Sequence, residues 1–365
     1  MQNNVTNIPD ALLQSGMTLF RCTEGELRRN VIRSEVFSYA GTRLVLAAYK
    51  GDNTLERLRN EMGHDHYGLH RIPTSARGIV LDFGANVGDF SIATALQRPF
   101  AQIVAVEPVP QQIWFMRLNL FLNNVTEMSC SDVGSSFGRG VCVLNRAITH
   151  HHAGLAYNGD VEVNFDLGNT QNAAIRNPLL RDTYAHWSGK DVPRLRKDRF
   201  PPYSQKTSTL VRAASARDFL IPFVPVLLLK FDCEGCEFDL LPSLHDELFN
   251  RTKIHWVGGE LHLSLIPKRT GREQRLHSRQ RSLSEVDATF AALRRRGCPT
   301  STWRILCERC ERRQNLDCLC GDCHRPAPGL HEFFSRRVRY RLFRLRKKGF
   351  FFVFVKGCAR SALGA

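Results

Sequence analysis

The sequence predicts an α/β protein built around a mostly parallel sheet. Three observations support this fold class: apolar strand-like runs alternate with helical patterns from residue 78 onward, a glycine-containing turn joins the first strand to its helix, and a basic and apolar alternation near the C-terminus is typical of a closing hairpin. Strands that alternate with helices form parallel sheets, because each helix carries the chain back to the start of the next strand.

The elements can be followed in order along the chain. Two strand and helix pairs come first, with strands expected at 78–83 and 102–107 and helices at 88–97 and 110–123. Later strands are expected at 141–148, 160–167, 207–213, 226–231 and 253–260. In the segment 160–167 the apolar residues alternate strictly with polar ones, which indicates a strand with one buried face. A capping box at 282–285 predicts a further helix that ends at Gly297.

These patterns divide the chain into four parts. Residues 1–77 form an N-terminal cap for which the sequence predicts no definite structure, and residues 78–297 form the α/β core. Within this core, residues 169–206 are expected to form a long loop or lid, with eight Lys/Arg against three Asp. Residues 298–330 form a cysteine-rich insertion, and residues 331–365 form a hairpin of strands at 338–345 and 350–355 that completes the sheet.

Composition limits the class of protein. A chain of 365 residues that is 43% hydrophobic can bury a large core, which excludes a disordered or fibrous protein. The formal net charge of +16 can attract phosphate, nucleic acid or an anionic membrane surface. No export signal or membrane-spanning run is visible, so we expect a cytoplasmic protein without a membrane span. Asn-x-Thr triplets begin at Asn4, Asn124 and Asn250, but they signify glycosylation only in a secreted chain.

The strongest local signal is the turn after the first strand, Asp82-Phe83-Gly84-Ala85-Asn86-Val87-Gly88. Its glycine spacing differs from that of dinucleotide-binding and P-loop motifs, so neither NAD nor a nucleoside triphosphate is indicated. Glu107 ends the second strand, where a carboxylate can accept both hydroxyls of a ribose. Together the turn and Glu107 favour a nucleoside cofactor without phosphates, although such turns also occur in α/β proteins that bind nothing.

Three ordered blocks within residues 78–262 resemble the FkbM family of methyltransferases. They are the turn 82–88, the pair Glu107-Pro108 with a later Asn-rich helix (Asn119, Asn123 and Asn124), and the segment 230–237, Lys-Phe-Asp-Cys-Glu-Gly-Cys-Glu. The resemblance implies a Rossmann-like methyltransferase fold that binds S-adenosylmethionine at the carboxyl edge of the sheet and transfers its methyl group, usually to a hydroxyl oxygen. It also implies cofactor-binding roles, listed here: Asp82, Gly84, Asn86 and Gly88 on the methionine and ribose side, and Glu107 on the ribose.

Candidate catalytic residues lie beyond the later strands. Asp232 and Glu234 directly follow a buried strand and can orient the acceptor, take its proton or hold a cation. His262 lies near the end of another strand and can serve as a general base, although a hydrogen-bonding role at the strand end is equally compatible with the sequence. Cys233 and Cys236 are expected to pack as small apolar residues.

The function is left open among three classes. The resemblance favours a small molecule, glycan or lipid hydroxyl, while the positive charge and the basic lid allow an RNA-directed methyltransferase. A cofactor-binding scaffold without activity is the third reading. The segment 199–203, Arg-Phe-Pro-Pro-Tyr, lacks the leading amide or carboxylate of amino-group methyltransferases, which favours oxygen methylation.

The second strongest signal is the cysteine-rich insertion. Cys307-x-x-Cys310 and Cys320-x-x-Cys323 are separated by nine residues, a spacing that allows four thiolates to surround a structural Zn²⁺ ion. Cys318 and His324 are competing ligands, and disulfides or free thiols are the alternatives.

Overall fold

The computed structural model describes fourteen stretches of the chain. They are residues 7–39, 41–62, 67, 69–135, 140–149, 151–152, 155–156, 159–166, 169–176, 206–215, 226–233, 254–262, 305–307 and 350–356. The lid segment 177–205, the helix expected at 282–297 and the strand expected at 338–345 lie outside these described residues.

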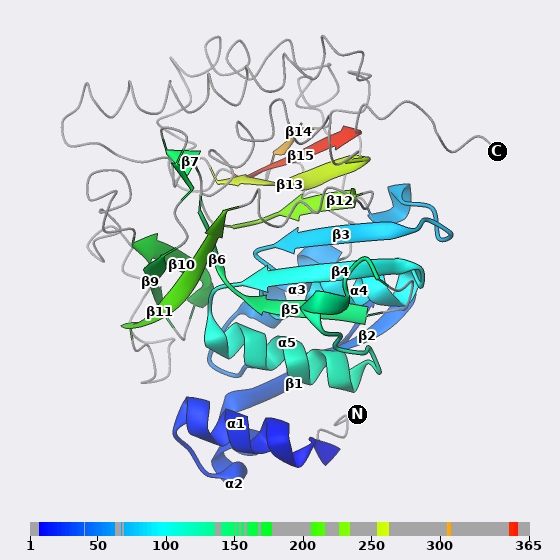
Figure 1. The fold of residues 1–365 in the computed structure, drawn as a ribbon. Coiled ribbons are helices and arrows are strands. Elements are labelled where there is room, and N and C mark those ends of the chain that lie inside the picture. The colour runs from blue at the N-terminus through cyan, green and yellow to red at the C-terminus, as the bar shows by residue number, and fades with distance from the viewer. Residues whose placement is uncertain are drawn as a thin grey trace.

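A seven-stranded sheet forms the centre of the described structure (Figure 1). Its strands are β3 (Gly78–Phe83), β4 (Ala101–Glu107), β5 (Gly140–Asn145), β12 (Val226–Phe231), β13 (Trp256–His262), β14 (Ile305–Cys307) and β15 (Phe350–Lys356), in the spatial order β14-β15-β13-β12-β3-β4-β5. The five strands from β13 to β5 are mutually parallel, which confirms the predicted α/β class with a mostly parallel sheet. All residues of β3, β4 and β12 are buried, as in a sheet covered on both faces.

The order of the parallel strands fixes a switch point, and we call the ligand position expected beyond the strand ends there the crevice. Numbered by their order along the chain, the five strands lie 3-2-1-4-5 from β5 to β13. The chain goes from β3 to β4 and β5 on one side and from β12 to β13 on the other side. Ligands of such sheets bind beyond the carboxyl ends of the strands at this switch point. The turn after β3 and the residues after β12 therefore meet where a ligand is expected.

The C-terminal strand differs from its prediction in its neighbours. β15 runs antiparallel to the rest and lies between β13 and β14, with His262 opposite Phe350 and Cys307 opposite Phe351. The strand itself was expected, but its partners in the described structure are β13 and β14 rather than the segment 338–345. Ile305–Cys307 thus joins the main sheet although it was assigned to the cysteine-rich insertion.

A second sheet starts where β5 ends. It contains β6 (Ala147–Thr149), β9 (Asp160–Asp166), β10 (Asn169–Arg176) and β11 (Lys206–Ser215) in the order β10-β9-β11-β6, and lies on the side toward which the carboxyl ends of β3 and β4 point (Figure 1). The short strands β7 (His151–His152) and β8 (Leu155–Ala156) form a separate pair.

Two sequence predictions are corrected by this second sheet. The strand expected at 141–148 is two strands, β5 and β6, which belong to different sheets. The expected lid begins with the strand β10, which pairs with β9. The alternating apolar residues of β9 bury one face against Val109 and the apolar side chains of β11, so a small core lies next to the carboxyl end of β4.

The N-terminal residues form a definite layer. Helices α4 (Asp89–Gln97) and α5 (Pro110–Leu122) cover the sheet, and the hairpin of β1 (Ile32–Tyr39) and β2 (Thr42–Tyr49) packs on these helices. Before the hairpin lie α1 (Asp10–Phe20), the single turn α2 (Glu24–Glu26) and a π-helical turn at Leu27–Val31. After it come α3 (Thr54–Met62) and the 3-10 turn Leu69–Arg71. One apolar core joins the cap to the sheet.

Helix α1 is fixed to α5 by one tryptophan. The Trp114 indole donates a hydrogen bond to the Leu12 carbonyl at 2.9 Å, and Phe20 meets the Trp114 ring edge to face at 5.5 Å. A Cβ on Gly16 would lie 2.5 Å from the Trp114 ring, so a glycine is required where the two helices touch. Burial of these aromatic rings stabilises the cap against the core.

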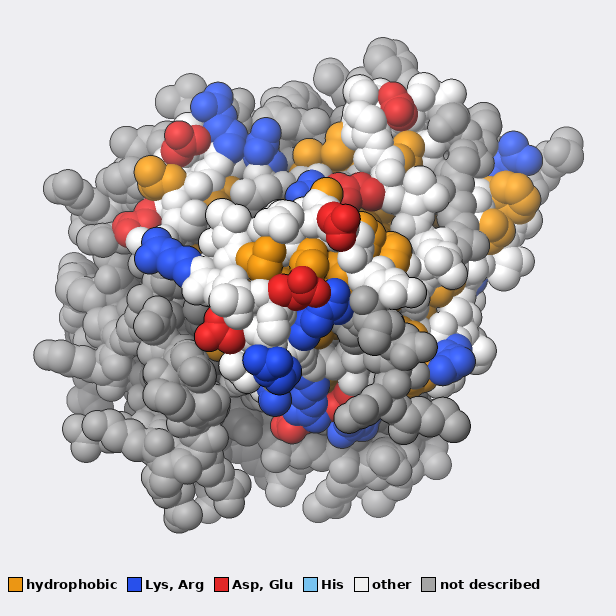
Figure 2. Space-filling model, turned by 90° about the horizontal axis from the view of Figure 1, so that it is seen from below, with side chains coloured by type: hydrophobic (Ala, Val, Ile, Leu, Met, Phe, Trp, Pro, Cys, Tyr) orange, Lys and Arg blue, Asp and Glu red, His pale blue; other side chains and the backbone are white. Residues whose placement is uncertain are grey.

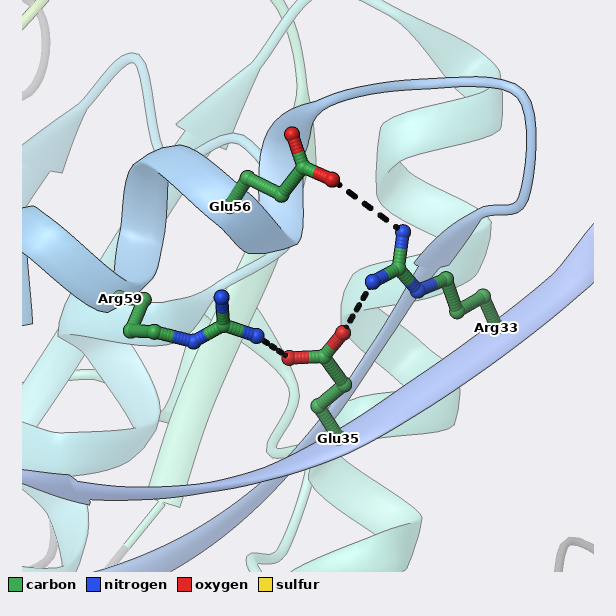
Figure 3. Close-up of polar contacts among 4 residues, drawn as sticks. All are labelled: Arg33, Glu35, Glu56 and Arg59. Carbon is green, nitrogen blue, oxygen red and sulfur yellow. Dashed lines mark hydrogen bonds and ion pairs between the residues drawn. The ribbon is translucent and has the colours of Figure 1, made fainter.

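Helix α3 is held on the hairpin by charged side chains. Glu35 on β1 accepts from both Arg33 and Arg59, and Arg33 also pairs with Glu56 at 3.7 Å (Figure 3). The four charges alternate in sign across the two elements. On the face seen in Figure 2, acidic and basic side chains of the described residues are likewise interspersed, so this face shows no basic surface of single sign among them. Within the described ranges, no helix is long and apolar enough to cross a bilayer.

Candidate functional site

The turn between β3 and α4 is held by its neighbours on both sides. Gly84 and Ala85 donate their backbone N–H groups to the Val106 carbonyl on β4, at 3.0 and 3.1 Å, and Asp232 donates its N–H to the Phe83 carbonyl at 2.9 Å. Gly84 has φ of +74°, and a Cβ there would lie 1.8 Å from the Asp232 carbonyl oxygen. Gly84 is therefore required by the approach of the chain to itself, whether or not a ligand is bound.

A buried ion pair lies beneath this turn. Asp82 and Lys230 are opposite each other in the register of β3 and β12, and the Lys230 Nζ lies 2.9 Å from Asp82 Oδ1. Asp82 Oδ2 accepts from the Ser91 hydroxyl at 2.6 Å, and Lys230 Nζ donates to the Gly84 carbonyl at 2.7 Å. Although burial lowers the pKa of Lys230, the carboxylates of Asp82, Asp232 and Asp89 raise it above its ordinary value. The Asp82 side chain thus holds Lys230 beneath the turn, and its expected contact with a cofactor stays a prediction.

The N-terminal cap contributes Tyr67 to the same place. Its hydroxyl donates to Asp232 Oδ2 at 2.8 Å, and the Lys230 ammonium lies 4.9 Å from the centre of its ring. Tyr67 also packs edge to face on Phe90 of α4 at 5.3 Å. Nearby, Arg98 donates to the Leu69 carbonyl at 2.6 Å and fixes the chain two residues after Tyr67. Asp232 is therefore positioned by a residue that is distant in sequence.

Glu107 closes the other side of the crevice. Its Oε2 accepts from the Asn86 backbone N–H and its Oε1 from the Val109 backbone N–H, both at 2.9 Å. A carboxylate offers about four acceptor positions, so about two remain for a ligand. Glu107 is 6% exposed, and it also fixes the conformation of the glycine turn through Asn86, whose φ is +51°.

Two carboxyl groups of the site have raised pKa values. Burial raises the pKa of Glu107 to about 7, against the lowering effect of its backbone hydrogen bonds. Burial also raises the pKa of Asp89, the first residue of α4, to about 7, although Lys230 acts in the opposite direction. Both groups therefore change charge near neutral pH, and a nearby cation favours their ionised forms.

Two amide oxygens at the crevice lack donors. Asn86 Oδ1 and Gln111 Oε1 are buried and have no hydrogen-bond partner in the described part of the chain. Asn86 belongs to the turn after β3, and Gln111 is in the first turn of α5, four residues after Glu107. Buried acceptors without partners are costly, so a ligand with N–H or O–H groups would stabilise both.

Asn119 connects the glycine turn to the N-terminal hairpin. Its Nδ2 donates to the carbonyls of Val87 and Ala47, both at 2.9 Å, while its Oδ1 accepts from the Ala47 N–H at 2.6 Å. One helical turn later, Asn123 makes the matching pair of hydrogen bonds to Val45. These asparagines of α5 satisfy backbone groups of β2, which explains why amides occur in an otherwise apolar helix.

The remaining candidate residues are placed in part. His262 is the last residue of β13, three residues beyond Gly259, which is level with Phe231, so its backbone lies at the carboxyl edge near Asp232. Glu234 and Cys236 lie outside the described residues. Lys230 and Tyr67 were not predicted as site residues. Lys230 had a signal, because it and Asp82 are each the fifth residue of a six-residue apolar strand.

The cysteines give one correction and one open prediction. Cys233 is disulfide-bonded rather than simply packed as a small apolar residue. Of the predicted zinc ligands, Cys307 is in β14 whereas Cys310, Cys320 and Cys323 lie outside the described residues. No group of metal-ligating side chains occurs among the residues that the structure describes, so the zinc site stays a prediction.

Comparisons with known proteins give no assignment. No model of a protein family matches the chain, and no curated protein matches it significantly.

Proposed function

We propose that the protein is an S-adenosylmethionine-dependent methyltransferase that acts on a hydroxyl oxygen. The observation that carries the proposal is a set of buried carboxyl groups and amide oxygens without donors, gathered at the switch point of a sheet with 3-2-1-4-5 order in the described structure. The antiparallel β15 beside β13 further supports the Rossmann-like methyltransferase variant expected from the sequence.

The charge of the crevice selects the class of ligand. Its carboxyl groups are those of Asp82, Asp89, Glu107 and Asp232, and Lys230 is the cation that interacts with them in the described structure. A phosphate group would meet net negative charge here, whereas a ligand with a sulfonium and an ammonium group would be attracted. This favours a cationic nucleoside over NAD or a nucleoside triphosphate.

The hydrogen-bonding capacity points to the same ligand. The free acceptor positions of Glu107 suit the two hydroxyls of a ribose, and the unpaired oxygens of Asn86 and Gln111 suit N–H or O–H donors. S-adenosylmethionine supplies ribose hydroxyls, an adenine amine and an ammonium group. The residues present therefore fit this cofactor.

When bound, S-adenosylmethionine supplies an activated methyl group on sulfur. The task of the protein is to align donor and acceptor and to exclude water. Asp232 Oδ2 accepts from the Tyr67 hydroxyl at 2.8 Å, and in the proposed reaction this carboxylate would accept a hydrogen bond from the acceptor hydroxyl and receive its proton as the methyl group arrives. Glu234 and His262 remain candidates for receiving that proton. Glu234 follows β12 in the sequence, and His262 is the last residue of β13.

Titration calorimetry tests the cofactor assignment. Full-length protein is expected to bind both S-adenosylmethionine and its demethylated product, and Glu107→Ala is expected to weaken binding at least tenfold because the ribose contacts are lost. Glu127→Ala is the matched control, since Glu127 pairs with Arg117 on the surface. Circular dichroism of each variant separates lost binding from lost folding. No heat of binding from folded wild-type protein would refute the proposal.

The acceptor class needs a separate experiment. Radiolabelled cofactor is incubated with the protein and with extracts separated into small molecules, glycans, lipids and RNA, and label is expected in an alkali-stable ether. Tyr67→Phe keeps the ring over Lys230 but removes the hydroxyl on Asp232, so it is expected to slow transfer while cofactor binding persists. Label in RNA alone would instead support the RNA-directed alternative.

A further inference from the structure

A consensus glycosylation triplet lies on an exposed turn. Asn124-Val125-Thr126 directly follows α5, where Asn124 adopts φ of +52° and its N–H donates to the Phe121 carbonyl at 3.1 Å. Asn124 and Thr126 are exposed, while Val125 is 5% exposed and anchors the turn in the core. A left-handed asparagine is a common helix terminator, and here it points the triplet outward from a fixed backbone.

The surroundings of the turn suit a carbohydrate. Phe121 precedes Asn124 by three residues in this turn, and its side chain is 41% exposed. The C–H face of a sugar attached to Asn124 can pack on such a ring, because aromatic faces attract the positive edge of C–H groups. The turn lies at the C-terminal end of α5, whereas the candidate site lies at its N-terminal end, so a glycan here leaves the crevice accessible.

A second observation concerns the compartment. Cys130 and Cys142 form a disulfide across a sequence separation of 12, joining the short 3-10 turn Cys130–Asp132 to the buried strand β5. Disulfides persist in oxidising compartments and are rare in the cytosol. Cys142 is fully buried, so this bond is part of the folded core and not an exposed reactive pair. The disulfide favours an oxidising compartment over the cytoplasmic location expected from the sequence.

We propose that the chain matures in an oxidising secretory compartment and carries an N-linked glycan on Asn124. Attachment forms a bond between the Asn124 side-chain nitrogen and the anomeric carbon of an oligosaccharide and breaks the bond between that carbon and a lipid pyrophosphate donor. The amide loses a proton and the lipid pyrophosphate leaves. Closing the disulfide transfers two electrons and two protons from the thiols of Cys130 and Cys142 to a disulfide-carrying oxidoreductase.

Peptide mapping of the full-length protein from its native cells tests the proposal. Free thiols are alkylated before digestion, and half of the digest is treated with peptide N-glycosidase in heavy-oxygen water. The expected results are a peptide pair linked through Cys130 and Cys142, and conversion of Asn124 to heavy-oxygen aspartate. Alkylated Cys130 and Cys142, or an Asn124 peptide that is unmodified before treatment, would overturn the proposal.

Variants produced in the same cells test the site itself. Thr126→Ala is expected to abolish glycosylation at Asn124, while Thr126→Ser retains the hydroxyl and the glycan. Both substitutions leave the backbone hydrogen bond of Asn124 to Phe121 in place, so Thr126→Ser is the folding control for Thr126→Ala. An unchanged glycan on Thr126→Ala would contradict the assignment. These outcomes do not depend on methyl transfer, so this proposal and the proposed function can fail separately.

Discussion

Replacement of Lys230 by methionine tests the buried ion pair most directly. Lys230→Met keeps the length of the side chain but removes the ammonium that contacts Asp82 Oδ1 at 2.9 Å and the Gly84 carbonyl at 2.7 Å. Asp82 is fully buried and would retain Ser91 as its hydrogen-bond donor in the described structure, so a nearly uncompensated charge would remain. Removing one partner of a buried pair costs about 3–5 kcal/mol of unfolding free energy.

Urea unfolding followed by circular dichroism measures this loss. With an m value of about 3 kcal/mol/M, the midpoint is expected to fall by about 1–1.7 M. The double variant Asp82→Asn with Lys230→Met should lose less than Lys230→Met alone, because no buried charge remains unpaired. Lys50→Met is the control, since Lys50 is exposed and bonds to the Arg29 carbonyl. A loss below about 1 kcal/mol for Lys230→Met would refute this reasoning.

Three further perturbations follow from the structure. Gly84→Ala is expected to cost roughly 3 kcal/mol of unfolding free energy, because of left-handed strain and the 1.8 Å contact with the Asp232 carbonyl. Gly41→Ala is the control, since Gly41 has φ of +82° but open space around it, and should show only the strain, about 1–2 kcal/mol. Equal losses in urea unfolding would contradict this reasoning. Asn119→Ala removes the partner of three backbone groups and is expected to lower the unfolding free energy by roughly 3 kcal/mol. Hydrogen exchange at the Ala47 amide should become faster, with the Val104 amide as reference. Unchanged exchange at Ala47 would argue against the role of the Asn119 hydrogen bonds. The pKa values of Glu107 and Asp89 are raised to about 7 from 4.5 and 3.8, so between these limits the folded protein binds more protons than the unfolded chain. The free energy of unfolding is therefore expected to fall as pH rises from about 4 to 7 and then to level off. Thermal unfolding measures this slope, which should flatten in the double variant Glu107→Gln with Asp89→Asn; a wild-type slope that persists there would exclude these groups as its cause.

The central sheet was predictable because its strands are buried on both faces. β3 and β12 begin and end at the residues expected from sequence, since each is a short apolar run followed by polar or glycine residues. Hydrophobic patterns do not specify which strands pair, however. The alternation in β9 correctly indicated a strand with one buried face, yet nothing local indicated that this face meets Val109 in a second sheet.

The candidate site could be anticipated only in the parts that are contiguous in sequence. The glycine turn and Glu107 could be recognised because each occupies a fixed place relative to a strand end. Tyr67 could not, because its contact with Asp232 joins residues with a sequence separation of 165 and depends on how the cap folds. The Cys130–Cys142 disulfide was equally hidden, since cysteine pairing cannot be deduced from spacing alone.

The hydrogen bonds of Asn119 have a consequence for protein engineering. A fragment cut at the boundary expected before Gly78 would lose the hairpin that Asn119 contacts, and it would expose the rings of Trp114 and Phe115 to water. Anyone grafting the candidate site onto another scaffold would have to transplant the N-terminal cap, residues 1–77, as well. The N-terminal cap is therefore part of the structure that holds the glycine turn in place, through the hydrogen bonds of Asn119 to Ala47 and Val87.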